Sequence, residues 1–223
     1  TPRSNRRQRQ MCIRDRALGV TEVCFAGSIA RPAIDPAKID AATAPLVPRL
    51  MAALQKGDDG ALREVLAIFE DAGIAIRAPH EFAASLLPAA AVFTSRKPEP
   101  RHEQDAGRAA EVLKTLGPLD IGQSCVAHRG QILAIEGQFG TDWMLASLRN
   151  RPDDKGGVFC KAAKPNQDRR VDLPVIGVDT VVAAKKARLD GLVVEEGGVM
   201  ILDLAGVTRA GDEAGLFFWV RAP

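Results

Sequence analysis

Short β-branched runs alternate with amphipathic helical stretches through most of the chain, and this order restricts it to folds in which helices cover sheets. The first run, at residues 20–27, ends in Gly27 and predicts a buried strand that leads into a turn. Apolar residues at helical spacing follow at 46–54 and 58–73, and residues 74–78 return to a strand pattern. Strand, helix, helix and strand in this order predict part of a doubly wound, Rossmann-like parallel sheet.

The expected Rossmann-like lobe is incomplete, because its first strand and Gly-rich turn would have to precede residue 20. Residues 1–16 stand there instead. They are dense in Arg, they show no apolar periodicity, and their MCIRDR stretch resembles a translated sequencing adapter. We therefore expect this segment to be extraneous to the fold. A disordered basic arm is the alternative, and a nucleic-acid role would rest on that arm alone.

A stretch rich in Ala, Pro and Ser at 85–100 is typical of a linker. It would separate an incomplete Rossmann-like N-terminal domain at 17–84 from a C-terminal catalytic domain at 101–223. A helical stretch and a β-hairpin around Arg129–Gly130 open the second domain, which we expect to be α+β. Further strands are expected at 158–162, 192–196, 199–203 and 216–220, with a helix through Val181, Ala184 and Leu189. The predicted fold class is α/β, with two lobes.

The composition argues against several classes of protein. Three His and four widely spaced Cys form no CxxC pair and no soft-metal cluster, which favours a reducing compartment. No apolar run approaches the roughly 20 residues needed to cross a bilayer. The net charge of +2 gives no general attraction to nucleic acid. We therefore expect a cytosolic protein that does not bind nucleic acid.

A charged segment at 161–177 follows an apolar strand directly, which is where loops meet ligands. A solvated charge run would explain the same composition. Val171 and Leu173-Pro174 flank Asp172, however, so the backbone is expected to be anchored while the carboxylate projects. The other charged and polar residues of the segment are Lys161, Lys164, Gln167, Asp168, Arg169 and Arg170. Its cations could hold phosphate oxygens, and Asp172 is the strongest catalytic candidate.

The tripeptide Gly140-Thr141-Asp142 offers backbone N–H groups at a helix start together with a hydroxyl and a carboxylate, which suits a phosphate and its hard metal ion. Capping of the helix by Thr141 explains the same residues. The same choice between ligand contact and local structure stays open for Ala26-Gly27-Ser28, which follows a strand, and for Lys56, which precedes a helix start.

Several familiar catalytic motifs are absent from the sequence. It contains no GxxxxGK[ST], no GxSxG, no HExxH and no RNP-type aromatic pattern. Cys160 lacks an obvious His partner, which disfavours a thiol nucleophile. His80 and Gln123 adjoin strands and are structural by default and pocket contacts by exception. The remaining carboxylates and cations are most naturally suited to hydrolysis of a phosphate or pyrophosphate bond assisted by Mg²⁺ or Mn²⁺.

The order of motifs resembles the LpxI-type UDP-2,3-diacylglucosamine pyrophosphatases of lipid A biosynthesis. The resemblance covers Ala17 to Phe218. It rests on the motifs CFAG-x-x-x-RP, KGDD-x-x-LR, APHE, LDIGQ, EG-x-x-GTD-x-ML, KAAKP-x-QD-x-RVDLP-x-IG and AGLFFW, taken in this order. Each motif is weak alone, and their joint spacing is what makes the resemblance specific.

The resemblance implies a metal-dependent enzyme of a Gram-negative bacterium that hydrolyses UDP-2,3-diacylglucosamine to UMP and 2,3-diacylglucosamine 1-phosphate (lipid X). It also implies Mg²⁺ or Mn²⁺ as cofactor and peripheral association with the cytoplasmic face of the inner membrane. Because the Gly-rich start is missing, a module that binds lipid X without hydrolysing its precursor is the alternative. The oligomeric state stays open.

The resemblance places the family's essential aspartate, in RVDLP, on Asp172. It implies sugar or phosphate contacts near Ala26 to Ile29, at Gln55-Lys56 and at Gly140-Thr141-Asp142, and a loop shorter than usual at 148–157. Together with the candidates above, the expected substrate-binding residues are Ala26, Gly27, Ser28, Ile29, Gln55, Lys56, His80, Gln123, Gly140, Thr141, Lys161, Lys164, Gln167 and Arg169. The expected metal ligands are Asp172 and Asp142.

Overall fold

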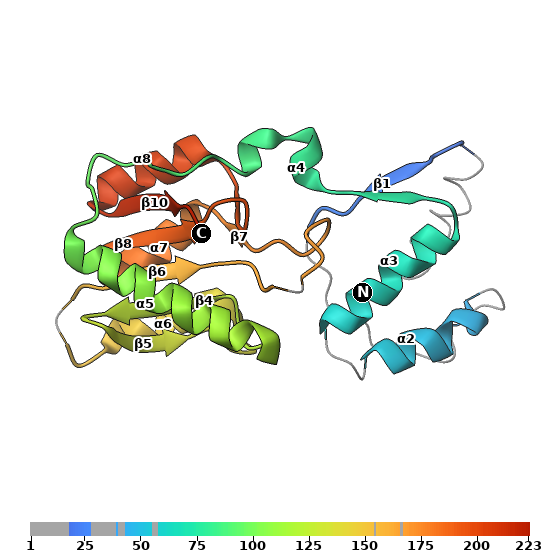
Figure 1. Ribbon diagram of the computed structural model, residues 1–223, viewed down its shortest axis with the longest axis horizontal. Coiled ribbons are helices and arrows are strands. Elements are labelled where there is room, and N and C mark those ends of the chain that lie inside the picture. The colour runs from blue at the N-terminus through green and yellow to red at the C-terminus, as the bar shows by residue number, and fades with distance from the viewer. Residues whose placement is uncertain (1–17, 28–38, 40–42, 55–57, 154, 166) are drawn as a thin grey trace. The chain divides into compact units, whose positions relative to one another are not determined.

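The computed structural model describes residues 18–27, 39, 43–54, 58–153, 155–165 and 167–223. The chain divides into two compact units, each with its own core (Figure 1). Unit 1 comprises Thr1–Glu81 and Asp168–Val171, and unit 2 comprises Phe82–Gln167 and Asp172–Pro223. Composition alone does not reveal that four residues of the charged segment return to unit 1. The predicted extraneous segment 1–16 lies outside the described residues.

Unit 1 combines a small parallel sheet with helices. Its elements are β1 (Glu22–Cys24), the 3-10 helix η2 (Ala44–Leu46), α2 (Val47–Leu54), α3 (Asp58–Asp71), β2 (Ala75–Arg77) and the first residues of α4 (Pro79–Phe82). β1 and β2 pair in parallel. The core contains Leu66, Phe69, Ile74 and Ile76. These elements confirm the strands and helices predicted for residues 20–78. The expectation that the first strand is buried is wrong, because Glu22 and Cys24 of β1 are exposed. The Rossmann-like description stays a prediction.

Gly73 ends α3 as its position in the sequence predicts. It adopts φ +76°, in the left-handed region that glycine enters without strain. The amide of Gly73 donates to the Glu70 carbonyl at 2.8 Å, and that of Ile74 donates to the Phe69 carbonyl at 3.0 Å. This pair of bonds is the Schellman arrangement, which satisfies carbonyls at the end of a helix and turns the chain toward β2.

Unit 2 is built on a mixed six-stranded sheet in the order β3-β10-β8-β6-β4-β5. The strands are β3 (Ala91–Val92), β4 (Ser124–His128), β5 (Gln131–Ile135), β6 (Val158–Lys161), β8 (Gly191–Glu195) and β10 (Phe217–Arg221). β6, β8 and β10 are parallel, while β3, β4 and β5 pair with their neighbours in antiparallel fashion. The predicted hairpin is confirmed, with Arg129 and Gly130 both at positive φ in its turn.

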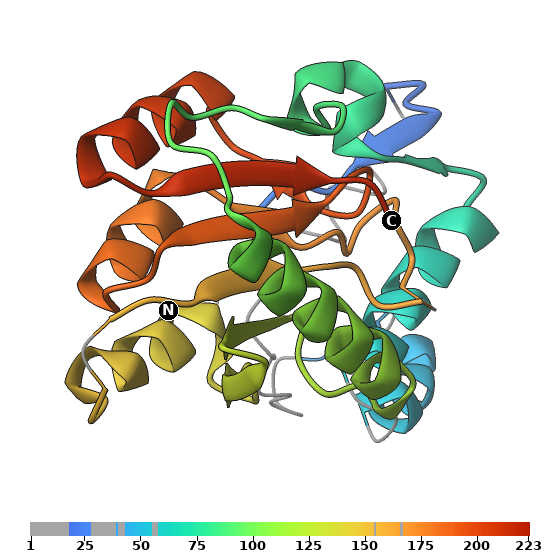
Figure 2. The same ribbon diagram turned by 60° about the vertical axis from the view of Figure 1, so that its left-hand side comes forward.

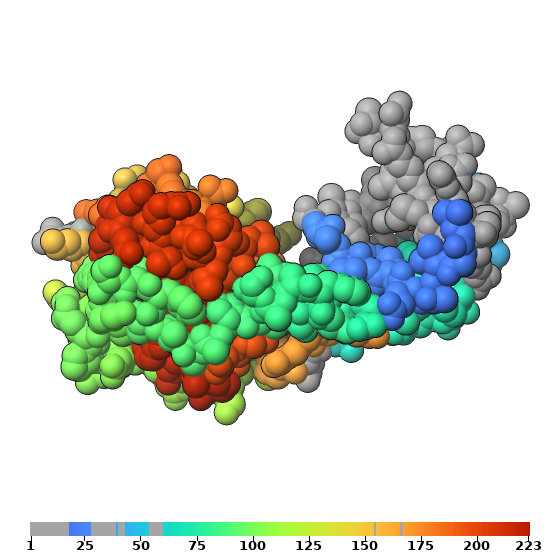
Figure 3. Space-filling view, turned by 90° about the horizontal axis from the view of Figure 1, so that it is seen from above, coloured from blue at the N-terminus to red at the C-terminus, as the bar shows by residue number. Residues whose placement is uncertain are grey.

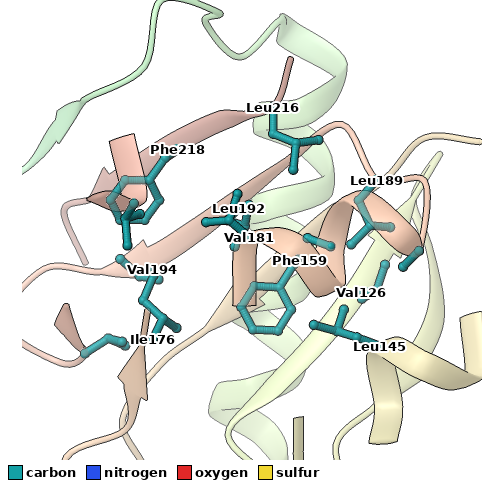
Figure 4. Close-up of a cluster of buried hydrophobic side chains, with 14 of the residues drawn as sticks. Val126, Leu145, Phe159, Ile176, Val181, Leu189, Leu192, Val194, Leu216 and Phe218 are labelled. Carbon is teal, nitrogen blue, oxygen red and sulfur yellow. The ribbon is translucent and has the colours of Figure 1, made fainter. Parts of the chain in front are cut away.

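Helices cover both faces of this sheet (Figure 2). α5 (Pro100–Leu116) packs on one face, and α6 (Gly140–Ser147), α7 (Val178–Lys186) and α8 (Leu204–Ala214) pack on the other. Strand residues alternate between the two layers, as the pleat of a sheet requires. Phe159, Leu192 and Phe218 face α6–α8 (Figure 4), whereas their neighbours Cys160, Val193 and Phe217 face α5.

Short elements complete unit 2. They are a two-stranded parallel sheet of β7 (Val175–Ile176) and β9 (Met200–Ile201), and the 3-10 helices η3 (Ala84–Leu86), η4 (Gly117–Leu119) and η5 (Leu148–Asn150). No helix in the described ranges combines the length and apolar character needed to cross a membrane.

The segment 85–100, predicted as a linker, is attached to the sheet of unit 2. β3 forms its edge strand, and the amide of Phe218 donates to Thr94 Oγ1 at 2.8 Å. Figure 3 shows this green segment lying against the red C-terminal elements. The sequence does not predict β3, because two residues are too few to show the alternation of apolar and polar side chains that marks a strand.

The C-terminal unit differs from the α+β expectation in its centre. α7 connects β6 to β8 and α8 connects β8 to β10, so the three middle strands form consecutive β-α-β crossovers. The sequence does not predict α8. The antiparallel strands flank these three, with β3 on one side and β4 and β5 on the other. The prediction of an α/β chain is confirmed.

Gly191 begins β8 where a side chain has no room, because a Cβ would overlap the ring of Phe217. We expect Gly191→Ala to lower the free energy of unfolding by about 1–3 kcal/mol through overpacking. Gly107→Ala, in α5 with nothing within 4 Å of the new Cβ, should instead raise it by about 0.5–1 kcal/mol. Denaturant unfolding measures both. Equal effects of the two substitutions would contradict the packing of Gly191 on Phe217.

Candidate functional site

The starts of three helices line one hollow of about 600 Å³ in unit 2. Phe139–Asp142 belong to the start of α6, Gly177–Thr180 to that of α7 and Leu202–Asp203 to that of α8. The first N–H groups of a helix have no partner within the helix, and the helix dipole is positive at that end. The start of α8 is already capped, because Asp203 Oδ1 accepts a hydrogen bond of 2.9 Å from the Gly206 amide. The starts of α6 and α7 have no capping side chain among the described residues, and these two starts at one place favour a bound anion.

The start of α6 is open to a ligand. Its N-cap residue is Phe139, and no side chain caps the helix in the described part of the chain. The prediction that Thr141 is the N-cap is wrong, because α6 begins at Gly140 and Thr141 lies within its first turn. Thr141 Oγ1 instead accepts a hydrogen bond of 2.7 Å from Lys161 Nζ. The Thr141 hydroxyl therefore keeps its own proton for donation.

Lys161 is the last residue of β6, and only 8% of it is exposed. Burial lowers the pKa of its ammonium group because water no longer solvates the charge, and the nearby carboxylates of Glu136 and Asp142 partly oppose this shift. Glu136 Oε2 lies 4.0 Å from Lys161 Nζ. The same oxygen accepts hydrogen bonds from Ser124 Oγ at 2.7 Å and from the Gln123 amide at 3.3 Å. Lys161 is thus a buried cation beside the hollow.

The loop after β6 brings other predicted residues close to Lys161. The amide of Ala162 donates to the Gln123 carbonyl at 3.0 Å. Lys164 Nζ donates to Asp120 Oδ1, and the Lys164 amide donates to Gln167 Oε1 at 3.1 Å. Gln167 Nε2 is buried and has no hydrogen-bond partner in the described part of unit 2. Gln123, Lys161, Lys164 and Gln167 therefore belong to one polar region.

The predicted residues of unit 1 lie at one edge of its small sheet. Ala26 and Gly27 follow β1 and are exposed, and His80 follows β2. Because β1 and β2 are parallel, their carboxyl ends meet at the same edge. His80 Nδ1 is buried and lacks a hydrogen-bond partner among the described residues. Ser28, Ile29, Gln55 and Lys56 lie outside the described residues.

The charged segment contributes to both units. Arg169 is exposed in the part that belongs to unit 1, and Asp172, which is half-buried, begins the next part of unit 2. Asp168 and Arg170 bind each other through several hydrogen bonds. Arg170 was not among the predicted site residues, although it is the Arg of the RVDLP motif.

The described residues contain no group of three or more His, Cys, Asp or Glu that could hold a metal ion. The carboxylate of Asp142 stands exposed in the first turn of α6. A cation that binds largely through phosphate oxygens needs only one or two protein carboxylates, which isolated groups such as Asp142 can supply.

The buried thiols are unsuited to nucleophilic attack, as predicted for Cys160. Cys125 and Cys160 face each other on β4 and β6, and neither forms a disulfide. Burial raises the pKa of Cys125 to about 12 and that of Cys160 well above its usual value. Both thiols stay protonated at neutral pH and serve the core.

Family models match both parts of the chain. The LpxI N-terminal domain matches residues 12–86, and the LpxI C-terminal domain matches residues 89–219. The chain belongs to the LpxI family. A relative from Caulobacter vibrioides, named UDP-2,3-diacylglucosamine pyrophosphatase LpxI, is 40% identical over 209 residues, which cover 91% of this chain and 75% of the relative. This LpxI chain carries the hollow, Lys161 and Asp172 within the second matched domain.

Burial of Lys161 predicts a pH-dependent stability. The folded lysine loses its proton at a lower pH than the unfolded one, which titrates near 10.5. Between these two pKa values the unfolded chain binds more protons, so stability rises with pH. The free energy of unfolding of the unaltered protein, minus that of Lys161→Met, should therefore increase as pH rises toward 10.5. Denaturant unfolding at several pH values measures it, and a constant or falling difference would show that Lys161 is not desolvated.

Proposed function

We propose that this LpxI chain hydrolyses the pyrophosphate bond of UDP-2,3-diacylglucosamine, releasing UMP and lipid X in lipid A biosynthesis. Its family and the activity named for the Caulobacter vibrioides relative support the substrate. The observation that carries the proposal is the convergence of the uncapped starts of α6 and α7 on one hollow, beside the buried ammonium of Lys161. Oriented N–H groups and a fixed cation are what a diphosphate requires.

In this proposal the start of α6 holds phosphate oxygens. Its first-turn N–H groups donate to them, and Lys161, which contacts Thr141 of this turn, supplies positive charge. Lys161 also donates to Thr141 Oγ1, which directs the hydroxyl proton of Thr141 away from the ammonium group and toward an oxygen acceptor. These groups are in place before the substrate arrives, so they stabilise developing charge without reorganisation.

Asp172 is the proposed catalytic residue. Its carboxylate orients the attacking water and accepts a proton from it as the water oxygen bonds to phosphorus. The bridging P–O bond then breaks, and its electron pair stays on the departing phosphate. The proposed substrate contacts further include Gln123, Lys164, Gln167 and Arg169, and in unit 1 Ala26, Gly27, Ser28, Ile29, Gln55, Lys56 and His80.

We also propose a divalent cation, Mg²⁺ or Mn²⁺, at the diphosphate. Asp142 and Asp172 would supply its protein oxygens and the substrate phosphates the others, as Mg²⁺ often binds in phosphate-transfer sites. When bound, it would neutralise charge on the phosphates.

The proposal includes two further features, one of location and one of fold. The lipid character of the substrate supports peripheral association with the cytoplasmic face of the inner membrane. The parallel pairing of β1 and β2, with α2 and α3 between them in the chain, supports a Rossmann-like description of unit 1.

Replacement of the proposed catalytic carboxylate provides the test. We expect Asp172→Ala to lower kcat by about 100-fold or more, as loss of an acid–base residue does, while lipid X still binds. Release of UMP from UDP-2,3-diacylglucosamine with Mg²⁺ or Mn²⁺ measures turnover. Glu111→Gln, on the exposed side of α5 where Glu111 pairs with Arg108, is the control and should leave turnover unchanged.

Two outcomes would contradict the proposal. Unchanged turnover in Asp172→Ala would remove Asp172 from the reaction. Binding of lipid X by the unaltered chain without any release of UMP would instead favour the alternative, a module that binds lipid X and does not hydrolyse its precursor.

A further inference from the structure

The residues just before Asp172 are fastened to unit 1 by a network around Arg170. The Arg170 side chain donates to Asp168 through Nε, at 3.0 Å to Oδ1, and through Nη2, at 2.7 Å to Oδ2. Its backbone amide donates to Asp168 Oδ1 at 3.0 Å. Its Nη1 reaches Glu70 Oε1, on α3, at 2.7 Å. A bidentate contact of this kind fixes the orientation of the guanidinium group as well as its distance from the carboxylate. We call Glu70, Asp168 and Arg170 the anchor.

An apolar contact strengthens the anchor. Val171 packs against the core of unit 1, whose members Leu66 and Phe69 come from the same helix α3 that carries Glu70. The amide of Val171 also donates to the Asp168 carbonyl at 3.1 Å. The turn at 168–171 is therefore held both by the ion pairs of Arg170 and by the packing of Val171 in the core of unit 1.

The anchor is charged at neutral pH. Hydrogen bonds from Arg170 are the largest cause of a lowered pKa of the Asp168 carboxyl group, and these outweigh the opposing effect of its partial burial. The Arg170 guanidinium is always protonated in this range. Asp168 and Arg170 therefore stay paired wherever the enzyme would work.

The residues just after Asp172 are fixed in unit 2. Leu173 is buried, and the amide of Met200 donates to the Pro174 carbonyl at 2.8 Å. Val175 then begins β7, which pairs with β9. Asp172 is consequently the single residue that separates two held pieces of chain.

We propose that Arg170 is a positioning residue that, through Asp168 and Glu70, determines where the Asp172 carboxylate lies during the reaction. The inference rests on the proposed function of Asp172. Ion pairs as exposed as Arg170–Glu70, with about 41% and 46% of the side chains accessible, add little to stability. Catalysis, in contrast, is sensitive to small displacements of a reacting group. The anchor therefore matters to turnover more than to folding.

Substitutions on α3 separate positioning from general stability. Glu70→Gln removes the carboxylate that binds Arg170, and Glu64→Gln, six residues earlier on the same helix, removes one that binds Arg49. We expect kcat for UMP release to fall about threefold in Glu70→Gln and about tenfold or more in Arg170→Gln, with KM changed less than about twofold. Glu64→Gln should leave kcat unchanged. Arg170→Lys keeps the positive charge but loses the planar guanidinium that binds two oxygens at once. Its kcat should lie between those of the unaltered chain and Arg170→Gln.

Hydrogen exchange tests the anchor without reference to activity. The amides of Arg170 and Val171 should exchange faster in Glu70→Gln and in Arg170→Gln than in the unaltered chain, and at the unaltered rate in Glu64→Gln. Denaturant unfolding shows whether each variant folds. If Arg170→Gln does not fold, the comparison of Glu70→Gln with Glu64→Gln still tests the anchor.

The outcomes distinguish this inference from the proposed function. Unaltered exchange in Glu70→Gln, an equal loss of kcat in Glu64→Gln, or a rise in KM with kcat unchanged would each overturn the role of Arg170. Full activity of Asp172→Ala would overturn the proposed function instead, and with it the catalytic part of the inference, while faster exchange would still establish the anchor.

Discussion

The apolar layer between the sheet of unit 2 and the helices α6, α7 and α8 is the constraint on which the site depends. Phe159, Leu192 and Phe218 from three parallel strands fill this layer (Figure 4). Parallel strands require crossover helices, and crossovers that pack on the same face begin at the same edge of the sheet. The three helix starts around the hollow follow from how this core is built.

This arrangement includes a buried lysine, whose desolvation is unfavourable. Lys161 ends the central strand β6 with its ammonium group out of water, partnered by the Thr141 hydroxyl and by Glu136 at 4.0 Å. Such a group is kept where its charge serves a ligand, because an apolar residue of similar size would pack at less cost. In this LpxI chain, the position of Lys161 beside an open helix start links the core of unit 2 to the proposed diphosphate site.

The sequence predicts most strands and helices. It does not predict those that are held by packing and show no periodic pattern of apolar residues. α8 contains Gly206 and Gly211, which weaken a helical pattern, yet a Cβ would meet Asp203 at the first position and Thr94 at the second. β3 and β7 have two residues each, too few to alternate. The attachment of Arg170 to Glu70 joins residues 100 positions apart and leaves no local signal.

The site is predicted in part for the same reason. Motifs point to Gly140, Thr141 and Lys161, because each stands at the end of a recognisable strand or the start of a helix. The start of α8 carries no motif, and that of α7 carries only the last residue of the KAAKP-x-QD-x-RVDLP-x-IG motif. Only the structure brings both starts to the same hollow.

Binding of phosphate in this hollow, at the start of α6, can be followed through amide chemical shifts recorded by NMR during a titration with lipid X. The largest changes should fall on Gly140, Thr141 and Asp142, and Lys161→Met should diminish them. Changes concentrated on α5, with the amides of α6 unaffected, would contradict it.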